Sequence, residues 1–286
     1  MEVMASMLVE LFCAVLLTAA DGGASALLKV NEHPWGSFVP KSWSIVQTVT
    51  ASNFEGRVVQ SVQTVRTTLQ SVDENGVTLL ESEAFTLDGK TVEKRPQIVK
   101  YDFFQEPIQE NVHISEGQPA KLMIGKRVVP CAVRIYTQQT AGEHLTTTIW
   151  YTAQVYPYVL RVEKILRSAP AGDNPGGHII RQSVMLVQET SALRTFGGGR
   201  RGKTYSVLTE EKAGNITKIT EARCSWDVPG GLLEATTREF DAQNREIRRS
   251  VSQMTNYSSY KLIQSPTQRF RTWVPSEVIY QQISLP

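Results

Sequence analysis

The stretch HLTTTIWYTAQVYPYVLRVEKI, residues 144–165, decides the fold class of this chain. Between residues 145 and 155 every second side chain is apolar or β-branched, and the positions between them are mostly polar. A period of two is typical of a β-strand with one buried face. Pro157 lacks the N–H that a sheet ladder needs, so we expect a bend after Val155 and a second strand from Val159.

A similar order of features returns later in the chain. Each copy has a Gly-Lys pair, an alternating run, a turn, a second strand, a proline, and a leucine five residues after that strand ends. These positions are Gly125, Lys126, Val155 and Leu160 in the first copy and Gly202, Lys203, Val228 and Leu233 in the second. The echo predicts one four-stranded meander used twice, over residues 121–190 and 191–262. A chance likeness between two β-rich segments is the alternative.

The segment before the repeat, residues 27–120, is expected to form an N-terminal meander. Asn-Gly and Asp-Gly pairs at 75–76 and 88–89 suit the positive φ values of tight hairpin turns. They separate expected strands, which lie near residues 42–53, 57–72, 77–87 and 90–100. Residues 101–120 contain two prolines and no sustained period, so a connection is expected there.

The chain as a whole is predicted to be all-β, with little helix. We expect a large antiparallel meander sheet, either half-barrel or sandwich-like. The aromatic lead-in around Trp35 and Phe38 is expected to plug one end of the core. The basic aromatic tail at 263–286 is expected to pack on the body as an arm.

The composition excludes several classes of protein. The chain has 286 residues, 41% of them hydrophobic and 20% charged, as in a folded protein with a sizeable core. Lys and Arg number 30 against 28 Asp and Glu, so no overall field draws the protein to nucleic acid. The three cysteines form no CxxC pair, and no HExxH motif or EF-hand loop occurs. We therefore expect neither a metal nor a cofactor.

Residues 1–26 differ from the rest of the chain. An unbroken apolar run at 11–20 is followed by small residues, which predicts a secretory signal peptide cleaved after Ala26. We therefore expect export to the periplasm or the cell exterior, with a buried or frayed amphipathic helix as the alternative. The run is too short to span a bilayer, which needs roughly 20 apolar residues. After cleavage Cys131 and Cys224 remain, either as one disulfide or as two buried thiols.

Residues 197–204, GGGRRGKT, match the nucleotide-binding pattern GxxxxGK[ST]. In such a loop Lys203 would reach the outer phosphates and Thr204 would bind magnesium. The phosphate site requires a helix that begins at the lysine, whereas the TYSVLTE that follows alternates as a strand does. A flexible basic hairpin loop is the favoured interpretation, and cofactor binding through Gly202, Lys203 and Thr204 is the alternative.

No other residues have the spacing of an active site. Glu81 and Glu83 share one face of a strand, and we expect this to be the solvated face. His33 has no possible ligand partner near it in the sequence, so it is expected to be a surface or capping residue.

Three segments carry a resemblance to known proteins. The HPW lead-in at 33–35, PYVLR at 157–161 and VPGG at 228–231 resemble segments of uncharacterised, predicted-exported β-rich bacterial proteins. More distantly, a long meander behind a signal peptide is similar in style to the half-barrel carriers that move lipoproteins or lipids through the periplasm. That resemblance implies a curved sheet over an apolar cavity with helical lids, and this sequence has no clear lid helices. It transfers no functional residue.

Together these patterns predict an exported, non-enzymatic binding or structural protein of the cell envelope. Its partner would be an apolar ligand, a lipid or an envelope protein. An open concave sheet face would bind the ligand, and the residues expected to line it are Ile149, Tyr151, Leu160 and Val162. The alternative is an enzyme or nucleotide-binding protein that uses Gly197–Thr204. A third possibility is a surface scaffold that makes contact through the basic aromatic tail.

Overall fold

The structure is a computed structural model that describes residues 33–54, 57–108, 111–140, 142–169, 177–196, 200–264 and 269–274. Within these ranges the chain forms fifteen β-strands and no helix. The strands are β1 (Trp43–Phe54), β2 (Arg57–Val72), β3 (Val77–Leu87), β4 (Lys90–Glu93), β5 (Gln97–Tyr101), β6 (Val112–Ile124), β7 (Arg127–Gln139), β8 (Glu143–Tyr151), β9 (Val159–Ser168), β10 (Ile179–Phe196), β11 (Arg200–Ala213), β12 (Ile216–Ser225), β13 (Leu232–Phe240), β14 (Glu246–Gln264) and β15 (Arg269–Val274). The predicted signal peptide and most of the predicted tail lie outside the described residues.

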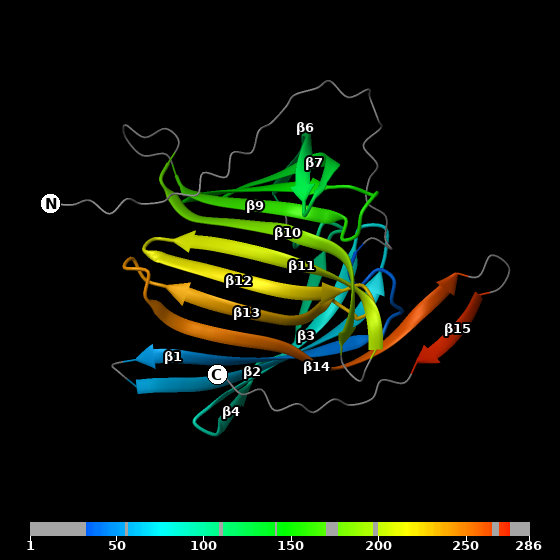
Figure 1. Ribbon diagram of the computed structural model, residues 1–286, viewed down its shortest axis with the longest axis horizontal. Helices are drawn as coiled ribbons and strands as arrows, with labels where there is room; N and C mark the ends of the chain where they lie inside the picture. Colours follow the sequence, from blue (N-terminus) through cyan, green and yellow to red (C-terminus); the bar gives the residue numbers. More distant parts are fainter. Residues whose placement is uncertain are drawn as a thin grey trace.

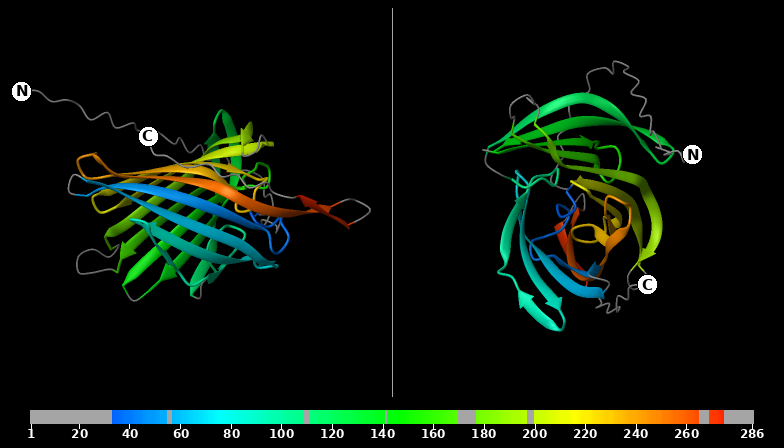
Figure 2. Two further views of the ribbon diagram at one scale, coloured as in Figure 1. Left: turned by 90° about the horizontal axis from the view of Figure 1, so that it is seen from below. Right: turned by 90° about the vertical axis from the view of Figure 1, so that its left-hand side faces the viewer.

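All fifteen strands belong to one antiparallel sheet (Figure 1). Its main order is β4-β3-β2-β1-β14-β13-β12-β11-β10-β9-β8-β7-β6, with β5 on β3 and β15 on β14. β1 pairs with both β2 and β14, so it joins the N-terminal meander to the rest of the chain. The order ends at β4 and β6, and the sheet is open. Figure 2 shows it curving strongly, so that the cyan strands β2 and β3 and the green strands β6 to β9 stand on different sides of the molecule. The prediction of an all-β, antiparallel meander is confirmed.

The expected hairpins of the N-terminal meander occur where the sequence places them. Asp88 and Gly89 have φ of +48° and +73°, as the tight turn between β3 and β4 requires. In the other pair Gly76 has a φ of +153° and Asn75 has no positive φ, and the link is a wider loop in which the Asp73 N–H donates to the Gly76 carbonyl at 3.0 Å. The fourth expected strand, at 90–100, is instead two short strands, β4 and β5. Pro96 lies between them and cannot donate to the ladder.

Residues 101–120, expected to be a connection, hold most of a strand. β6 begins at Val112 and contains Pro119, where its pairing with β7 shifts between Gly117 and Ala120. The proline is tolerated because β6 is the last strand of the sheet and because an irregular position needs no ladder donor. This irregularity also breaks the period of two in the sequence.

β8 ends at Tyr151 and not at the predicted Val155. The N–H of Thr152 donates to the carbonyl of Tyr158 at 2.9 Å, which closes a loop around Pro157. Residues beyond Tyr151 still alternate in the sequence, but their N–H groups have left the ladder. Alternation alone therefore made the predicted strand too long.

The loop between β12 and β13 closes in the same way. β12 ends at Ser225 and not at Val228, and the Ser225 N–H donates to the carbonyl of Gly231 at 2.7 Å. In the first loop the Thr152 hydroxyl also accepts the N–H of Gln154, at 3.3 Å. In the second, the Ser225 hydroxyl accepts the N–H of Asp227, at 3.2 Å. In both, the next strand carries a register shift at a buried leucine, Leu160 in β9 and Leu233 in β13. This parallel favours the predicted repeat, whose two-copy division stays a prediction.

Loops cover one face of the sheet, here called the inner face, at one end. Phe104 from the β5–β6 connection packs on Tyr151, with ring centroids 4.8 Å apart. Trp35 and Phe38 are buried in a cluster with Leu69 and its neighbours on β2 and β3. Trp35 and Phe38 therefore plug the core, as predicted.

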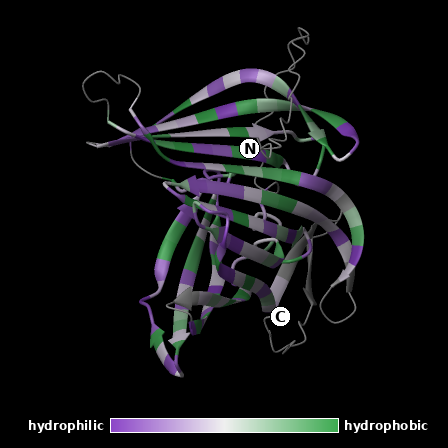
Figure 3. Ribbon diagram, turned by 60° about the vertical axis from the view of Figure 1, so that its left-hand side comes forward, coloured by the Kyte–Doolittle hydropathy of each residue, from purple (hydrophilic) through white to green (hydrophobic). Residues whose placement is uncertain are grey.

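The inner face changes from apolar to polar across the sheet. One cross-strand row begins with the apolar side chains Ile149, Val162 and Met185. The same row continues through hydroxyl side chains on the next strands, which are Thr209, Thr220, Thr237, Ser250 and Thr50. Several hydroxyls bond directly across strands, as Thr220 with Thr237 and Thr50 with Ser250 do at 2.9 Å. Figure 3 shows hydrophobic and hydrophilic residues alternating along the strands. This row is therefore apolar at one end and polar at the other, whereas the next row of the same face carries Val187, Val207, Ala222 and Ala235.

Candidate functional site

The four residues predicted to line an open face are packed in the core. Ile149 and Leu160 have no exposed surface, Tyr151 is 1% exposed and Val162 is 9% exposed. Ile149, Tyr151 and Val162 lie in one cluster under Phe104, whereas Leu160 packs in a second cluster with residues of the β6–β7 hairpin. Phe104 of the β5–β6 connection occupies the space over the first three residues, and the β6–β7 hairpin occupies the space over Leu160. The structure leaves no open face at these positions.

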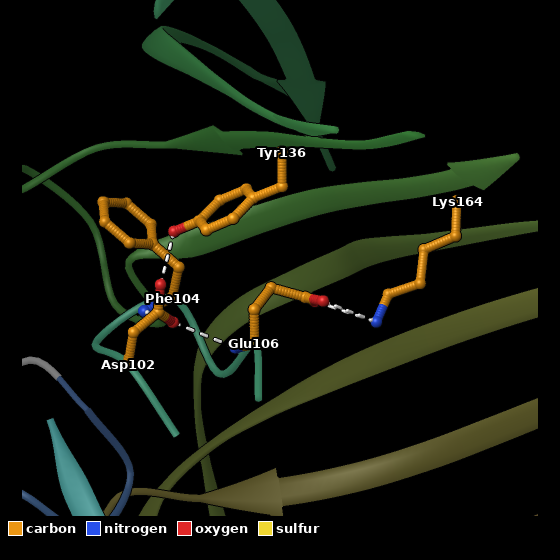
Figure 4. A network of polar contacts seen from close by, with 5 residues as sticks. All are labelled: Asp102, Phe104, Glu106, Tyr136 and Lys164. Atoms are coloured by element: carbon orange, nitrogen blue, oxygen red, sulfur yellow. Dashed lines mark hydrogen bonds and ion pairs between the residues drawn. The ribbon is translucent and has the colours of Figure 1, made fainter. Parts of the chain in front are cut away.

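Polar contacts fix this connection to the sheet (Figure 4). The Asp102 carboxylate accepts the N–H groups of Phe104 and Glu106 at 2.9 and 3.0 Å, so it closes a tight turn. Its second oxygen accepts the Tyr136 hydroxyl at 2.5 Å. Burial, followed by the bond to Asp102, raises the pKa of Tyr136, so this hydroxyl stays protonated and remains a donor.

The same connection is held at a second point by an ion pair. Lys164 Nζ of β9 lies 2.8 Å and 2.9 Å from the two carboxylate oxygens of Glu106. Burial raises the pKa of Glu106, and Lys164 offsets part of that rise. These side chains bind one another, so we interpret them as an anchor that holds the connection to the sheet.

A hollow of about 260 Å³ opens on the inner face beside the anchor. We call it the Trp35 hollow. It lies among the lead-in, strands β1 to β3, the β5–β6 connection and the β12–β13 loop. Its lining residues are His33, Pro34, Trp35, Ser44, Val46, Thr67, Leu79, Glu81, Tyr101, Gln105, Pro229, Gly230 and Leu232.

The HPW and VPGG segments meet at this hollow. A Cβ added to Gly230 would lie 3.0 Å from the Trp35 ring, and Gly230 has a φ of +77°. Only glycine combines that backbone conformation with such a close approach. His33 is 3% exposed and its Nδ1 accepts the Trp35 N–H at 3.1 Å, so it is a capping residue but not a surface one. Burial lowers the pKa of His33 to about 3, so its ring is neutral.

Glu81 supplies the carboxyl group of the Trp35 hollow. Burial, and then the charge of Glu83, raises the pKa of Glu81. Burial, and then Glu81, raises the pKa of Tyr101 on the same wall. Glu81 and Glu83 share one face of β3, as predicted, but it is the inner face that also carries buried Leu79, so Glu81 is half-buried instead of fully solvated. That alternation was visible in the sequence, but the covering lead-in was not.

The match to a nucleotide-binding loop lies partly outside the described residues. Gly197, Gly198 and Gly199 are not described, whereas residues 202–204 lie within β11. No helix begins at Lys203, so the dipole that holds a phosphate in such loops is missing there. The Thr204 hydroxyl is buried and donates to the Ala192 carbonyl at 3.0 Å.

The two cysteines that follow the predicted signal peptide lie apart on the sheet. Cys131 and Cys224 are both free thiols, on β7 and β12. Among the described residues no three His, Cys, Asp or Glu side chains are arranged to hold a metal ion. The described ranges also contain no helix that is long and apolar enough to cross a membrane.

Fold and hollow together define an all-β protein with one open, curved sheet whose inner face is partly covered by its own loops. No family model and no curated protein matches the chain. A protein from Bacteroides fragilis, thought to be exported and with a YmcC-like fold, is 8% identical, with a TM-score of 0.31; the match covers 78% of this chain and 99% of that one. A Vibrio parahaemolyticus domain, thought to belong to an outer membrane lipoprotein-sorting protein, is 9% identical, with a TM-score of 0.33 and coverages of 77% and 85%. These likenesses are too weak to carry an argument about function.

Proposed function

We propose that the protein is an exported, non-enzymatic binding protein of the cell envelope that holds a small, largely apolar ligand in the Trp35 hollow. Export is inferred from the apolar run at 11–20. The observation that carries the binding proposal is the hollow itself, where Trp35, Leu79 and Pro229 form the apolar part of the wall and a single carboxyl group stands among polar side chains such as Thr67 and Gln105. Hollows with apolar walls and few polar groups are the usual form of small-molecule sites.

The volume of the Trp35 hollow limits the size of the ligand that it can hold. Pockets that bind drug-sized ligands have volumes of roughly 300–1,000 Å³, and the Trp35 hollow, at about 260 Å³, lies just below that range. The row of hydroxyl side chains from Thr209 to Thr50 borders this part of the inner face. The best fit is therefore a compact molecule, or one end of a chain, with a hydroxyl or amine directed at Glu81.

Fluorescence titration with N-phenyl-1-naphthylamine tests this proposal. This neutral probe brightens in apolar surroundings, and we expect saturable binding to the full-length chain. Thr67→Phe fills the hollow and should weaken binding at least about tenfold, since an overfilled site expels its occupant. Thr68→Phe is the matched control, because Thr68 is next in β2 and points to the other face. An absence of saturable binding, or equal binding by both variants, would overturn the proposal.

A further inference from the structure

A second hollow, about 320 Å³ in volume, has the opposite electrostatic character. We call it the Lys203 hollow. It lies among the start of β7, the β8–β9 loop and the start of β11. Its lining residues are Arg127, Ala153, Gln154, Val155, Tyr156, Tyr158, Lys203 and Thr204. Two cationic side chains and no carboxyl group stand on this wall.

Neither cation has an acidic partner among the described residues. Glu and Asp side chains pair with other lysines and arginines across the sheet, as in the Lys164–Glu106 and Arg223–Glu234 contacts at 2.8 and 3.0 Å. No ion pair of the described chain includes Arg127 or Lys203. Both side chains are exposed, so water screens the repulsion between them, and an anion bound between them would replace it with attraction.

The backbone that carries Lys203 is fixed on both sides. On one side the Thr204 hydroxyl donates to Ala192 of β10 at 3.0 Å. On the other, the Ser225 hydroxyl donates to the Lys203 carbonyl at 3.0 Å. A charged group on a fixed backbone loses less freedom when it binds a ligand.

Two tyrosines of the β8–β9 loop, Tyr156 and Tyr158, form the aromatic part of the wall. Tyr156 packs on Trp226 of the β12–β13 loop, with ring centroids 3.9 Å apart and planes at 81°. Tyr158 packs on the same tryptophan, at 5.6 Å. The rings are held by one another, so they form a rigid aromatic part of the wall in the same hollow as the cations.

We infer that the Lys203 hollow binds the oxyanion head of an amphipathic ligand, a phosphate or sulfate ester, between Arg127 and Lys203, with its apolar part against Tyr156 and Tyr158. The guanidinium and ammonium groups supply only donors, which matches an oxyanion that only accepts. The geometry differs from a nucleotide-binding loop, since Lys203 acts from a strand and Thr204 is occupied. The hollow is distinct from the Trp35 hollow and does not depend on the function proposed for it.

Isothermal titration of the full-length chain with phenyl phosphate tests this inference. We expect saturable binding that weakens in 0.5 M NaCl, because salt screens partly exposed charges. Arg127→Gln and Lys203→Gln should each weaken it about fivefold, whereas Lys90→Gln, an exposed lysine on β4, should leave it unchanged. Phenyl glucoside, a neutral aromatic, should not bind.

Two further arms identify the source of the anion. If the protein co-sediments with phosphatidylglycerol vesicles but not with phosphatidylcholine vesicles, and if Lys203→Gln abolishes this co-sedimentation, the anion is a lipid headgroup. Binding of phenyl phosphate without vesicle binding assigns a soluble ester. Circular dichroism checks that each variant is folded, and the salt dependence of the unaltered protein gives a readout without mutation. An absence of saturable binding, or binding that both variants retain, would overturn the inference.

Discussion

Replacing Lys164 with methionine should destabilise the protein in a way that depends on pH. Lys164 is the only cation paired with Glu106 in the described structure, and the Glu106 side chain is 13% exposed. Lys164→Met keeps the apolar stem of the side chain but leaves this buried carboxylate without a counter-charge. Because Glu106 lies in the connection that covers the inner face, the loss should loosen that cover.

The size of the effect follows from the exposure of the two partners. Removing one partner of a fully buried pair costs about 3–5 kcal/mol. The Lys164 side chain is 41% exposed, so water already screens the pair and the cost is lower. We expect the free energy of unfolding to fall by about 1–2 kcal/mol at pH 7. Lys94→Met breaks a more exposed pair, with Glu83, and should cost less than about 0.5 kcal/mol.

The sign of the pH dependence follows from the raised pKa of Glu106. A carboxyl group with a folded-state pKa above its unfolded value of 4.5 favours folding in its protonated form. Its contribution is fully present below pH 4.5 and is lost as the pH rises through the folded-state pKa. Without Lys164 that pKa rises further, so the deficit of the variant should be largest at neutral pH and should shrink towards pH 4.

Urea unfolding of wild type, Lys164→Met, Glu106→Gln and the double variant, at pH 7 and pH 4, measures this. The double variant has no carboxylate at position 106 that needs a counter-charge, so most of the stability deficit of Lys164→Met at pH 7 should disappear. A deficit equal at both pH values, or no coupling in the double-mutant cycle, would refute the reasoning.

Three more predictions follow from the inner face. Gly230→Ala should lower the free energy of unfolding by about 1 kcal/mol more than Gly89→Ala, since both glycines have positive φ but only Gly230 meets Trp35; equal losses in urea melts would contradict this. Leu160→Ala and Leu233→Ala should each cost about 2–5 kcal/mol because both leucines are buried, and a loss below about 1 kcal/mol in either melt would show loose packing there. Burial raises the pKa of Cys131 and of Cys224 to about 11, so both thiols should react slowly with Ellman's reagent at pH 8 in the native protein. In guanidinium without reductant both should react quickly. A failure of both to react after unfolding would indicate a disulfide.

The candidate site could be predicted only in fragments. The HPW and VPGG segments stood out in the sequence, but nothing in it placed Trp35 against Gly230, in a distant part of the chain. The four predicted ligand contacts were well chosen as inward-facing residues. Three of them are not open because Phe104 covers their cluster from a connection with no regular pattern of its own, and Leu160 is not open because the β6–β7 hairpin packs on it.

The sequence by itself determined the class of the fold and most strand positions. A period of two and the Asn-Gly and Asp-Gly turns are local properties, set by a few neighbouring residues, so they can be recognised without knowing the rest of the chain. The tertiary structure alone decided which strand face is covered, where strands such as β8 stop, and where the two hollows lie. Alternation gives every strand two faces, but the loops that cover one of them come from distant parts of the chain, and only the register across β1 and β14 brings those parts together.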